Sequence, residues 1–211
     1  MTQTITIQGE TFILDPTGSV FWQSKNLLLI ADVHLGKVAH FRKYGAAVPS
    51  KASSKNYDKL EEVIARHKPE TICFLGDLFH STLNNEWNIF ETWVKKKPTK
   101  IILVSGNHDI ISPHKFEALG IEVLDQLKID SFLLTHHPTE KEKIFNFSGH
   151  IHPGVRMRGP GRQTLKLACF FRTNNQMILP AFGSFTGKYI LQPSEKDTVY
   201  AIVENEVICV S

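Results

Sequence analysis

Chemically active residue types follow five apolar runs of the sequence. The runs with their polar ends are LLLIADVH (27–34), ICFLGDLFH (72–80), IILVSGNHD (101–109), FLLTHHP (132–138) and FNFSGHIHP (145–153). Burying a charge or an unpaired imidazole is costly unless the group is paired or bound to a metal. A polar cluster repeated after each run therefore calls for one shared explanation, such as a site at the ends of neighbouring strands.

Asp32 and His34 lie two residues apart, so in an extended segment both side chains project to the same side. A carboxylate oxygen and an imidazole nitrogen placed in this way can bind one cation. A pH-sensitive surface pair is an equally good interpretation of this motif alone.

Two turns that begin with glycine differ in how strongly they indicate a functional site. Asp77 follows Gly76, and a turn aspartate is the more common meaning of such a pair. The GNHD turn is more specific, because an amide, an imidazole and a carboxylate follow one glycine at Asn107, His108 and Asp109. A purely structural role for GNHD is the less favoured interpretation.

Two histidine pairs complete the set. His136 and His137 are adjacent, so on a strand they face opposite sides, and we expect one of them to reach a site. His150 and His152 flank one residue in GHIHP, and local spacing leaves open whether they pack, bind one metal or bind two.

Seven of the ten histidines lie in or beside these five strand ends. A cluster of Asp, Asn and His without cysteine suits borderline to hard divalent ions such as manganese, iron or zinc. A structural zinc site with thiolate ligands is not indicated.

The elements that must position these residues can be predicted from periodicity. The first thirty residues contain the runs TITIQGETFIL and SVFWQ, split by the turn DPTGS, which predict a β-hairpin region at about residues 1–25 before the strand NLLLIADVH. Helical spacing follows in SSKNYDKLEEVIARHKP and in NNEWNIFETWVKKKP, each preceding another apolar strand.

The alternation of strand and helix predicts a sheet with parallel character, whereas the second half predicts mostly antiparallel strands separated by short turns. Both halves fit an α/β fold in which a two-sheet β sandwich is flanked by α-helices. We expect a single domain over residues 1–211, because the chain is long enough for one sizeable core.

Composition adds few constraints. The net charge of +3 falls short of the strongly basic balance that is typical of nucleic-acid binders. Cys73, Cys169 and Cys209 are odd in number and widely spaced, which indicates free thiols. With no signal-peptide pattern and no long apolar run, we expect a cytoplasmic protein without a membrane partner.

In this order, the motifs DVH, GDLFH, GNHD, THH and GHIH resemble those of the calcineurin-like metallophosphoesterase superfamily, whose four-layer αββα fold agrees with the predicted sandwich. IADVHLGKVAHFRKYGAAVP, GHIHPGVRMRG and LPAFGSFTGKY are also similar to the bacterial ligase-associated DNA damage response endonuclease family (PdeM type). Lys188 departs from this pattern, where a second glycine after FTG is usual.

The resemblance implies a role for each site residue. Asp32, His34 and His152 would bind a first metal, Asp77 would bridge two metals, and the second metal would be bound by Asn107, His136 and His150. His136 is preferred to His137 because it lies nearer the strand end. His108 would face the substrate as a catalytic residue, oriented by Asp109. The resemblance implies two divalent ions, with manganese expected and iron or zinc as alternatives.

Basic residues follow the first and last motifs. Lys37, Arg42, Arg156 and Arg158 are candidates for contacting substrate phosphates, although a solvated surface explains any one of them equally well. Phe182 and Phe185 in PAFGSFTG either stack on a base or pack under a loop, and we expect packing.

The resemblance implies a phosphodiesterase that cleaves DNA, an endonuclease of DNA repair associated with an ATP-dependent DNA ligase, a helicase and an exonuclease. One alternative is a hydrolase of small phosphoesters or cyclic nucleotides. Another is a binding protein that has the fold without the catalysis, which predicts missing ligands or a replaced His108.

Overall fold

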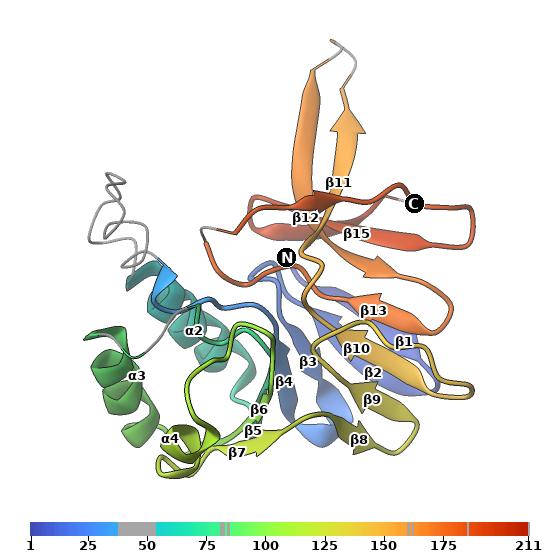
Figure 1. Ribbon diagram of the computed structural model, residues 1–211. Coiled ribbons are helices and arrows are strands. Elements are labelled where there is room, and N and C mark those ends of the chain that lie inside the picture. The colour runs from blue at the N-terminus through green and yellow to red at the C-terminus, as the bar shows by residue number, and fades with distance from the viewer. Residues whose placement is uncertain are drawn as a thin grey trace.

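Two β-sheets packed face to face form the centre of the computed structural model (Figure 1). The structure describes residues 1–37, 54–80, 83, 85–159, 161, 163–184 and 186–210. The helices among them cover the outer face of the first sheet (Figure 1). This arrangement confirms the expected two-sheet sandwich flanked by helices.

The first sheet has seven strands in sequence order. Its first four strands pair antiparallel, and the pairs from the fourth to the seventh are parallel. The strands are β1 (Gln3–Ile7), β2 (Glu10–Leu14), β3 (Val20–Trp22), β4 (Leu27–Ile30), β5 (Thr71–Leu75), β6 (Lys100–Val104) and β7 (Glu122–Leu124), with a short 3-10 helix η1 (Gln23–Lys25) before β4.

The run TITIQGETFIL forms two strands instead of one. Gln8 and Gly9 have φ angles of 49° and 85°, so the chain reverses between β1 and β2. Left-handed conformation at two successive residues suits a tight hairpin turn, since its twist matches that of the flanking strands. The predicted N-terminal hairpin is therefore present, with an additional turn inside the first apolar run.

Helices connect the parallel strands and pack on the first sheet. They are α2 (Ser54–His67), α3 (Asn85–Lys95) and the short α4 (Pro113–Glu117). Leu60 and Val63 of α2 and Trp87, Phe90 and Val94 of α3 are buried against this sheet, and Ile64 packs beside them partly buried. The apolar spacing of these two helices therefore indicated their packing faces correctly.

The second sheet has nine strands and mixed pairing. Most pairs are antiparallel, as expected, but β10 runs parallel to both of its neighbours, β9 and β13. The strands are β8 (Leu127–Ile129), β9 (Phe132–Leu134), β10 (Phe145–Ser148), β11 (Pro153–Arg158), β12 (Thr164–Arg172), β13 (Gln176–Ile178), β14 (Tyr189–Ile190), β15 (Thr198–Val203) and β16 (Glu206–Cys209).

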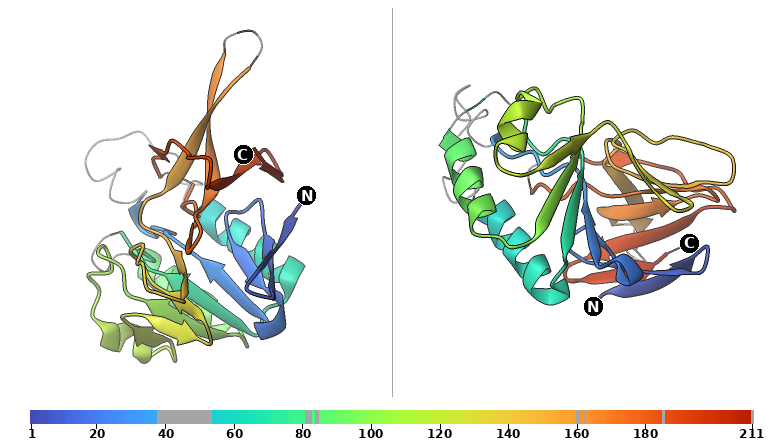
Figure 2. Two further views of the ribbon diagram at one scale, coloured as in Figure 1. Left: turned by 90° about the vertical axis from the view of Figure 1, so that its right-hand side faces the viewer. Right: turned by 90° about the horizontal axis from the view of Figure 1, so that it is seen from below.

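The hairpin of β11 and β12 projects away from the body of the molecule (Figure 1 and the left view of Figure 2). Its far end has no other strand beside it, whereas the base of β12 pairs with β13 and β15. The hairpin therefore extends the second sheet into solvent.

The core between the sheets is rich in aromatic residues. Phe12, Trp22, Phe132 and Phe147 are at most 1% exposed, and the ring centroids in five of their six pairs are 4.7–6.1 Å apart. Close packing of this kind fixes how the two sheets are placed relative to each other. The polar residues after β4, β5, β6, β9 and β10 are thereby brought to one edge of the sandwich.

Asp15 connects the turn after β2 to the end of α2. Its carboxylate accepts hydrogen bonds from Arg66 Nη1 at 2.6 Å and from Thr17 N at 2.9 Å, and it lies 2.8 Å from His67 Nε2. Burial alone would raise the pKa of Asp15, but His67, Arg66 and Thr17 outweigh it and hold the pKa well below its usual range.

We expect Asp15→Asn to lower the free energy of unfolding by about 1–3 kcal/mol at pH 7, because Arg66 and His67 then face no charge. A depressed carboxyl pKa stabilises the fold above the unfolded value of 3.8. The difference from wild type should therefore shrink as the pH falls below 4, measured by urea unfolding at pH 7 and at pH 3. Glu62→Gln, which removes only an exposed partner of Arg66, is the control and should change stability by less than about 0.5 kcal/mol.

Candidate metal centre

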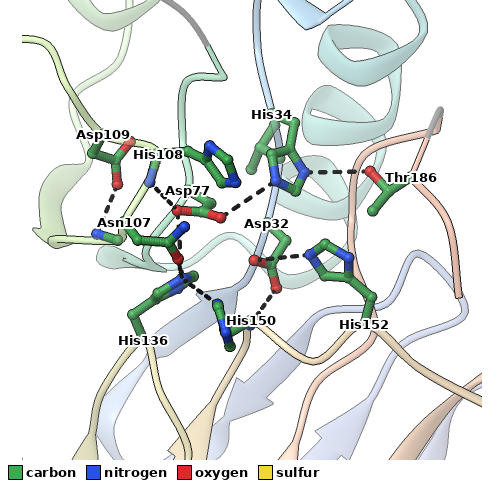
Figure 3. Close-up of polar contacts among 12 residues, drawn as sticks. Asp32, His34, Asp77, Asn107, His108, Asp109, His136, His150, His152 and Thr186 are labelled. Carbon is green, nitrogen blue, oxygen red and sulfur yellow. Dashed lines mark hydrogen bonds and ion pairs between the residues drawn. The ribbon is translucent and has the colours of Figure 1, made fainter. Parts of the chain in front are cut away.

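The polar residues predicted from the five strand ends meet in one cluster (Figure 3). Each position follows from the strand before it: Asp32 and His34 come after β4, Asp77 after β5, Asn107 after β6, His136 after β9, and His150 and His152 after β10. The apolar strands are buried up to the residue at which the polar motif begins. The sheets therefore place the side chains, and the loops orient them.

Five of these residues have left-handed backbone conformation. The φ angles of Asp32, His34, Asp77, His150 and His152 lie between 51° and 67°. Asp and His are among the residue types that adopt this conformation more readily than most, yet it still costs of order 1–3 kcal/mol per residue. Strain gathered at one point of the fold indicates a functional site.

Two glycines allow the loops to approach the carboxylates closely. A Cβ at Gly149 would lie 2.5 Å from Asp32 Oδ2, and one at Gly106 would collide with the backbone and side chain of Asp77. Next to these glycines, His150 N donates to Asp32 Oδ2 at 2.9 Å and His108 N donates to Asp77 Oδ1 at 2.9 Å. The backbone therefore supplies hydrogen-bond donors to both carboxylates.

One group of ligand atoms surrounds Asp32. Asp32, His34 and His152 offer an oxygen and two nitrogens that all lie within 4.8 Å of one another. Asp32 Oδ1 and His152 Nε2 are 3.3 Å apart, and both are buried atoms without a hydrogen-bond partner. Two unbonded lone-pair atoms pointing at each other in a buried site fit a cation between them.

A second group surrounds His136. Its Nε2 lies 2.9 Å from Asn107 Oδ1, 3.2 Å from His150 Nδ1 and 3.4 Å from Asp77 Oδ1. The other Asp77 oxygen lies 3.4 Å from His34 Nε2, which belongs to the first group. Asp77 thus reaches both groups, and a set formed by Asp32, Asp77 and His136 also joins them.

The protonation states suit cation binding. Burial alone would raise the pKa of Asp77, but His34, the His108 N–H and His136 outweigh it and lower the pKa to about 2. Burial lowers the pKa of His34, and burial together with His137 and His136 lowers the pKa of His150. Ionised carboxylates and neutral imidazoles are the forms that bind metals.

His136 and His137 take different positions. His136 is 2% exposed, and its Nδ1 lies 2.9 Å from Leu75 O, which leaves Nε2 directed into the cluster. His137 is exposed, but its ring centroid is only 4.1 Å from that of His150. The geometry favours His136 as the central ligand, while both histidines approach His150, which simple strand alternation did not predict.

The sequence predicts that Asp109 orients the His108 ring. In the structure, Asp109 instead binds backbone groups of the turn. Its two oxygens accept hydrogen bonds from Phe79 N at 3.0 Å and Gly106 N at 2.9 Å. Burial raises the pKa of Asp109 to about 6 despite these donors. A short acidic side chain in a tight turn satisfies nearby backbone donors first, so Asp109 fixes the GNHD turn that carries His108.

His108 itself is exposed, and its ring lies 6.0 Å from that of His34.

The four basic candidates are spread out. Lys37 is half-buried beside the cluster, where burial lowers the pKa of its ammonium and the charges of Asp77 and Asp32 oppose that shift. Arg156 and Arg158 are exposed on β11, outside the cluster. Arg42 lies outside the described residues.

The loop after β13 supplies contacts that sequence reasoning missed. Thr186 Oγ1 lies 3.3 Å from His34 Nδ1, on the side of the ring away from Asp77. Asn56 of α2 donates to Val33 O and accepts from Ser184 N, so it ties this loop to the DVH segment. The small residues of FGSFTG were the available signal, because Gly183 packs where a Cβ would lie 2.5 Å from Val33 O.

Phe182 is fully buried in the core beneath α2, and Lys59 Nζ lies 4.2 Å above its ring. The expected packing role of Phe182 is confirmed. Phe185 lies outside the described residues.

Comparison with known protein families agrees with this geometry. Residues 25–160, which contain every strand-end motif, match the family described as calcineurin-like phosphoesterase. The chain belongs to this family. Metallophosphoesterases are hydrolases that use divalent metal ions, which fits the two groups of ligand atoms. Comparison with curated proteins gave no match.

Comparison with solved structures also gave matches. The chain is similar to the Pseudomonas putida nuclease MPE, with a TM-score of 0.84, 28% identity and coverage of 100% of both chains. It also matches the Aquifex aeolicus protein of unknown function AQ665 (TM-score 0.44, 22% identity, 60% of this chain and 78% of that one). The Escherichia coli phosphoesterase Yfce matches with a TM-score of 0.43 and 17% identity over 87% of this chain and 97% of that one.

Among the described residues, no helix is long and apolar enough to cross a bilayer.

We expect Gly149→Ala to reduce metal affinity and to lower the free energy of unfolding by about 1–3 kcal/mol, because the new methyl group would press on Asp32 and Ala31. Gly187→Ala is the matched control, since a Cβ there meets no atom within 4 Å, and it should change stability by less than about 0.5 kcal/mol. Calorimetric metal titration and thermal unfolding measure both effects. Wild-type metal affinity in Gly149→Ala would contradict the close approach described above.

Proposed function

We propose that this chain is a phosphodiesterase that uses two divalent metal ions to hydrolyse phosphodiester bonds in DNA, most specifically as an endonuclease. The observation that carries the proposal is the pair of ligand groups that share Asp77. Two-metal sites are common in enzymes that cleave phosphodiesters. Similarity to a nuclease over the whole length of both chains supports a nucleic acid as the substrate, and the family resemblance of the sequence motifs favours DNA.

The ligand assignment follows the two groups. We assign Asp32, His34 and His152 to the first ion, Asp77 to both ions, and Asn107, His136 and His150 to the second. Carboxylate, amide and imidazole donors without a thiolate suit manganese, iron or zinc, and we propose manganese as the working metal. When bound, two such ions supply a nucleophile at neutral pH and neutralise charge on the phosphate.

Hydrogen bonds at Nδ1 can fix the tautomers of His136 and His34 so that Nε2 of each ring is free to bind a metal. If Nδ1–H of His136 donates to Leu75 O, its Nε2 keeps a lone pair directed at Asp77 and Asn107. If Nδ1–H of His34 donates to Thr186 Oγ1, its Nε2 likewise keeps a lone pair facing Asp77. Such outer hydrogen bonds fix the tautomer and the orientation of a ligand histidine.

His108 is the residue best placed to act on the substrate. Its backbone N–H is anchored to Asp77, and its ring is exposed above the cluster. We assign to this imidazole the stabilisation of charge on the phosphate and the donation of a proton to the leaving oxygen. Asp109 contributes by holding the turn, so it is a positioning residue in this assignment.

The charge balance favours an anionic substrate. Asp32 and Asp77 contribute two negative charges, while the histidines and Asn107 are neutral ligands. Two divalent cations therefore leave the loaded site net positive, which attracts a phosphodiester. Lys37 adds a further positive charge beside the carboxylates.

We propose a cytoplasmic role in DNA repair together with an ATP-dependent DNA ligase, a helicase and an exonuclease, based on the family resemblance of IADVHLGKVAHFRKYGAAVP and LPAFGSFTGKY. A binding protein without catalysis is disfavoured, because every expected ligand type and His108 are in place.

A substrate panel tests the proposed function. With Mn²⁺, we expect nicking of supercoiled plasmid, cleavage of single-stranded DNA and turnover of bis(p-nitrophenyl) phosphate, with much weaker turnover of p-nitrophenyl phosphate. The chromogenic diester and the monoester share the p-nitrophenolate leaving group, so the difference between their rates reports recognition of a diester and not the ease of expelling that group. Initial rates measured with Mn²⁺, Zn²⁺ and Fe²⁺ identify the working metal. Hydrolysis of the monoester alone would show a small-molecule phosphoesterase instead.

Two substitutions separate catalysis from metal binding. His108→Ala should keep the wild-type metal content and lose about 10²–10⁴-fold in kcat, the usual contribution of a general acid. Asp77→Ala should lose metal as well as activity, because this carboxylate serves both groups of ligands. Elemental analysis of the purified proteins, combined with diester hydrolysis, tests both. A fully active His108→Ala protein would refute its catalytic assignment.

A further inference from the structure

An open cleft of about 610 Å³ lies at the base of the β11–β12 hairpin. It follows the edge of β11, where β14 separates from it after two paired residues. The volume falls within the roughly 300–1,000 Å³ typical of small-molecule pockets. Its lining includes Val155, Arg156, Met157, Arg158, Leu191 and Val199.

Both walls of the cleft continue directly from the candidate metal centre. β11 begins at Pro153, the residue after His152. On the other wall, Tyr189 N donates to His152 O at 2.9 Å, and Thr186 lies against His34. A strand rises about 3.3 Å per residue, so Arg156 is only about 13 Å along β11 from His152. A polymer that is cut at the metal centre and runs along β11 would therefore reach this cleft within a few of its units.

The charges along β11 lack a partner in the described part of the chain. Arg156 pairs across the hairpin with Lys166, which places two positive charges side by side. Directly opposed like charges destabilise a sheet. No ion pair among the described residues involves Arg156, Arg158 or Lys166, and the nearby Asp197 carboxylate accepts from Ser194 N and Oγ. These positions are therefore suited to binding anions.

The same cleft has apolar surface. Val155 and Val199 belong to a small core on the outer face of the second sheet, and Met157 and Leu191 pack on it while remaining partly exposed. Tyr189, the residue before the lining Ile190, is 66% exposed. An exposed aromatic ring on the strand that borders a cleft with apolar and cationic lining residues fits nucleotides, which combine a flat base with a phosphate.

We propose that this cleft is a nucleotide subsite, which binds the part of a single DNA strand next to the bond that is cut. Tyr189 stacks on one base at the entrance, and Arg156 and Arg158 bind the neighbouring phosphates, assisted by Lys166. This inference rests on the proposed function, because it assumes a DNA strand at the metal centre. It assigns a specific role to a hairpin that otherwise extends into solvent.

The test is an abasic scan. Single-stranded substrates carry one cleavable diester bond, resistant phosphorothioate bonds elsewhere, and an abasic residue at one position at a time. For the wild-type protein loaded with Mn²⁺, we expect one position near the cut at which base removal lowers kcat/KM about five- to tenfold. Tyr189→Ala should lose a similar factor on the intact strand and no longer respond to the abasic residue at that position. Tyr189→Phe keeps the ring and should behave as wild type.

A charge series tests the arginines. Arg156→Gln with Arg158→Gln should weaken binding of single-stranded DNA and reduce the slope of log affinity against log salt by about 1.4, from two phosphate contacts at about 0.7 each. The loss on DNA should exceed that on bis(p-nitrophenyl) phosphate at least fivefold. Lys96→Gln with Lys128→Gln removes the same charge from exposed lysines elsewhere and should leave the salt slope unchanged. Thermal unfolding of every variant excludes misfolding as the cause.

The outcomes separate the subsite from the enzyme. If the wild-type protein cleaves single strands but Tyr189→Ala keeps the full abasic response, the subsite is refuted and the proposed function stands. If the arginine pair changes the oligomeric state in sedimentation and leaves the salt slope intact, this face is an interface between copies and the subsite is again refuted. If the wild-type protein cleaves no DNA, the proposed function fails and the subsite fails with it.

Discussion

Two buried carboxylates that make direct contact with no ammonium or guanidinium group among the described residues impose the main constraint on this structure, although the half-buried Lys37 adds a positive charge beside them. Asp32 and Asp77 are at most 1% exposed, and their contacts among the described residues are imidazoles and backbone N–H groups. Neutral donors reduce the desolvation penalty of two adjacent anions without balancing their charge. Cations do balance it, so the convergence of five strand ends, the two close glycines and the imidazole side chains all serve one electrostatic requirement.

The general plan of this site could be predicted from the sequence because it is encoded locally. An apolar run that ends in Asp, Asn or His marks a strand end, and stacked sheets bring such ends together. The question raised by GHIHP is answered by that assembly. His152 lies with Asp32 and His34, whereas His150 lies with His136, so the pair spans two groups of ligands. Spacing within the motif alone could not distinguish this from a shared ion.

Long-range contacts account for what sequence reasoning missed. The partners of Asp109 are backbone groups of Phe79 and Gly106, a choice set by how the GNHD turn packs on the loop after β5. Thr186 reaches His34 across 152 positions of sequence, and Asn56 reaches Ser184 across 128. The approach of His137 to His150 likewise depends on the register between β9 and β10. Such contacts depend on tertiary packing and leave little trace in residue periodicity.

The left-handed backbone at five positions of the cluster also limits how this site can change over evolutionary time. Asparagine tolerates that conformation nearly as well as aspartate, whereas valine, isoleucine and threonine do not. At Asp32 and Asp77 an exchange to asparagine would remove a charge without disturbing the loop, while a β-branched replacement would disturb both. A lineage that loses catalysis can therefore keep the fold most easily when asparagine replaces these two aspartates. We therefore expect Asp at these two positions in working enzymes, and Asn in descendants that retain the same shape without catalysis.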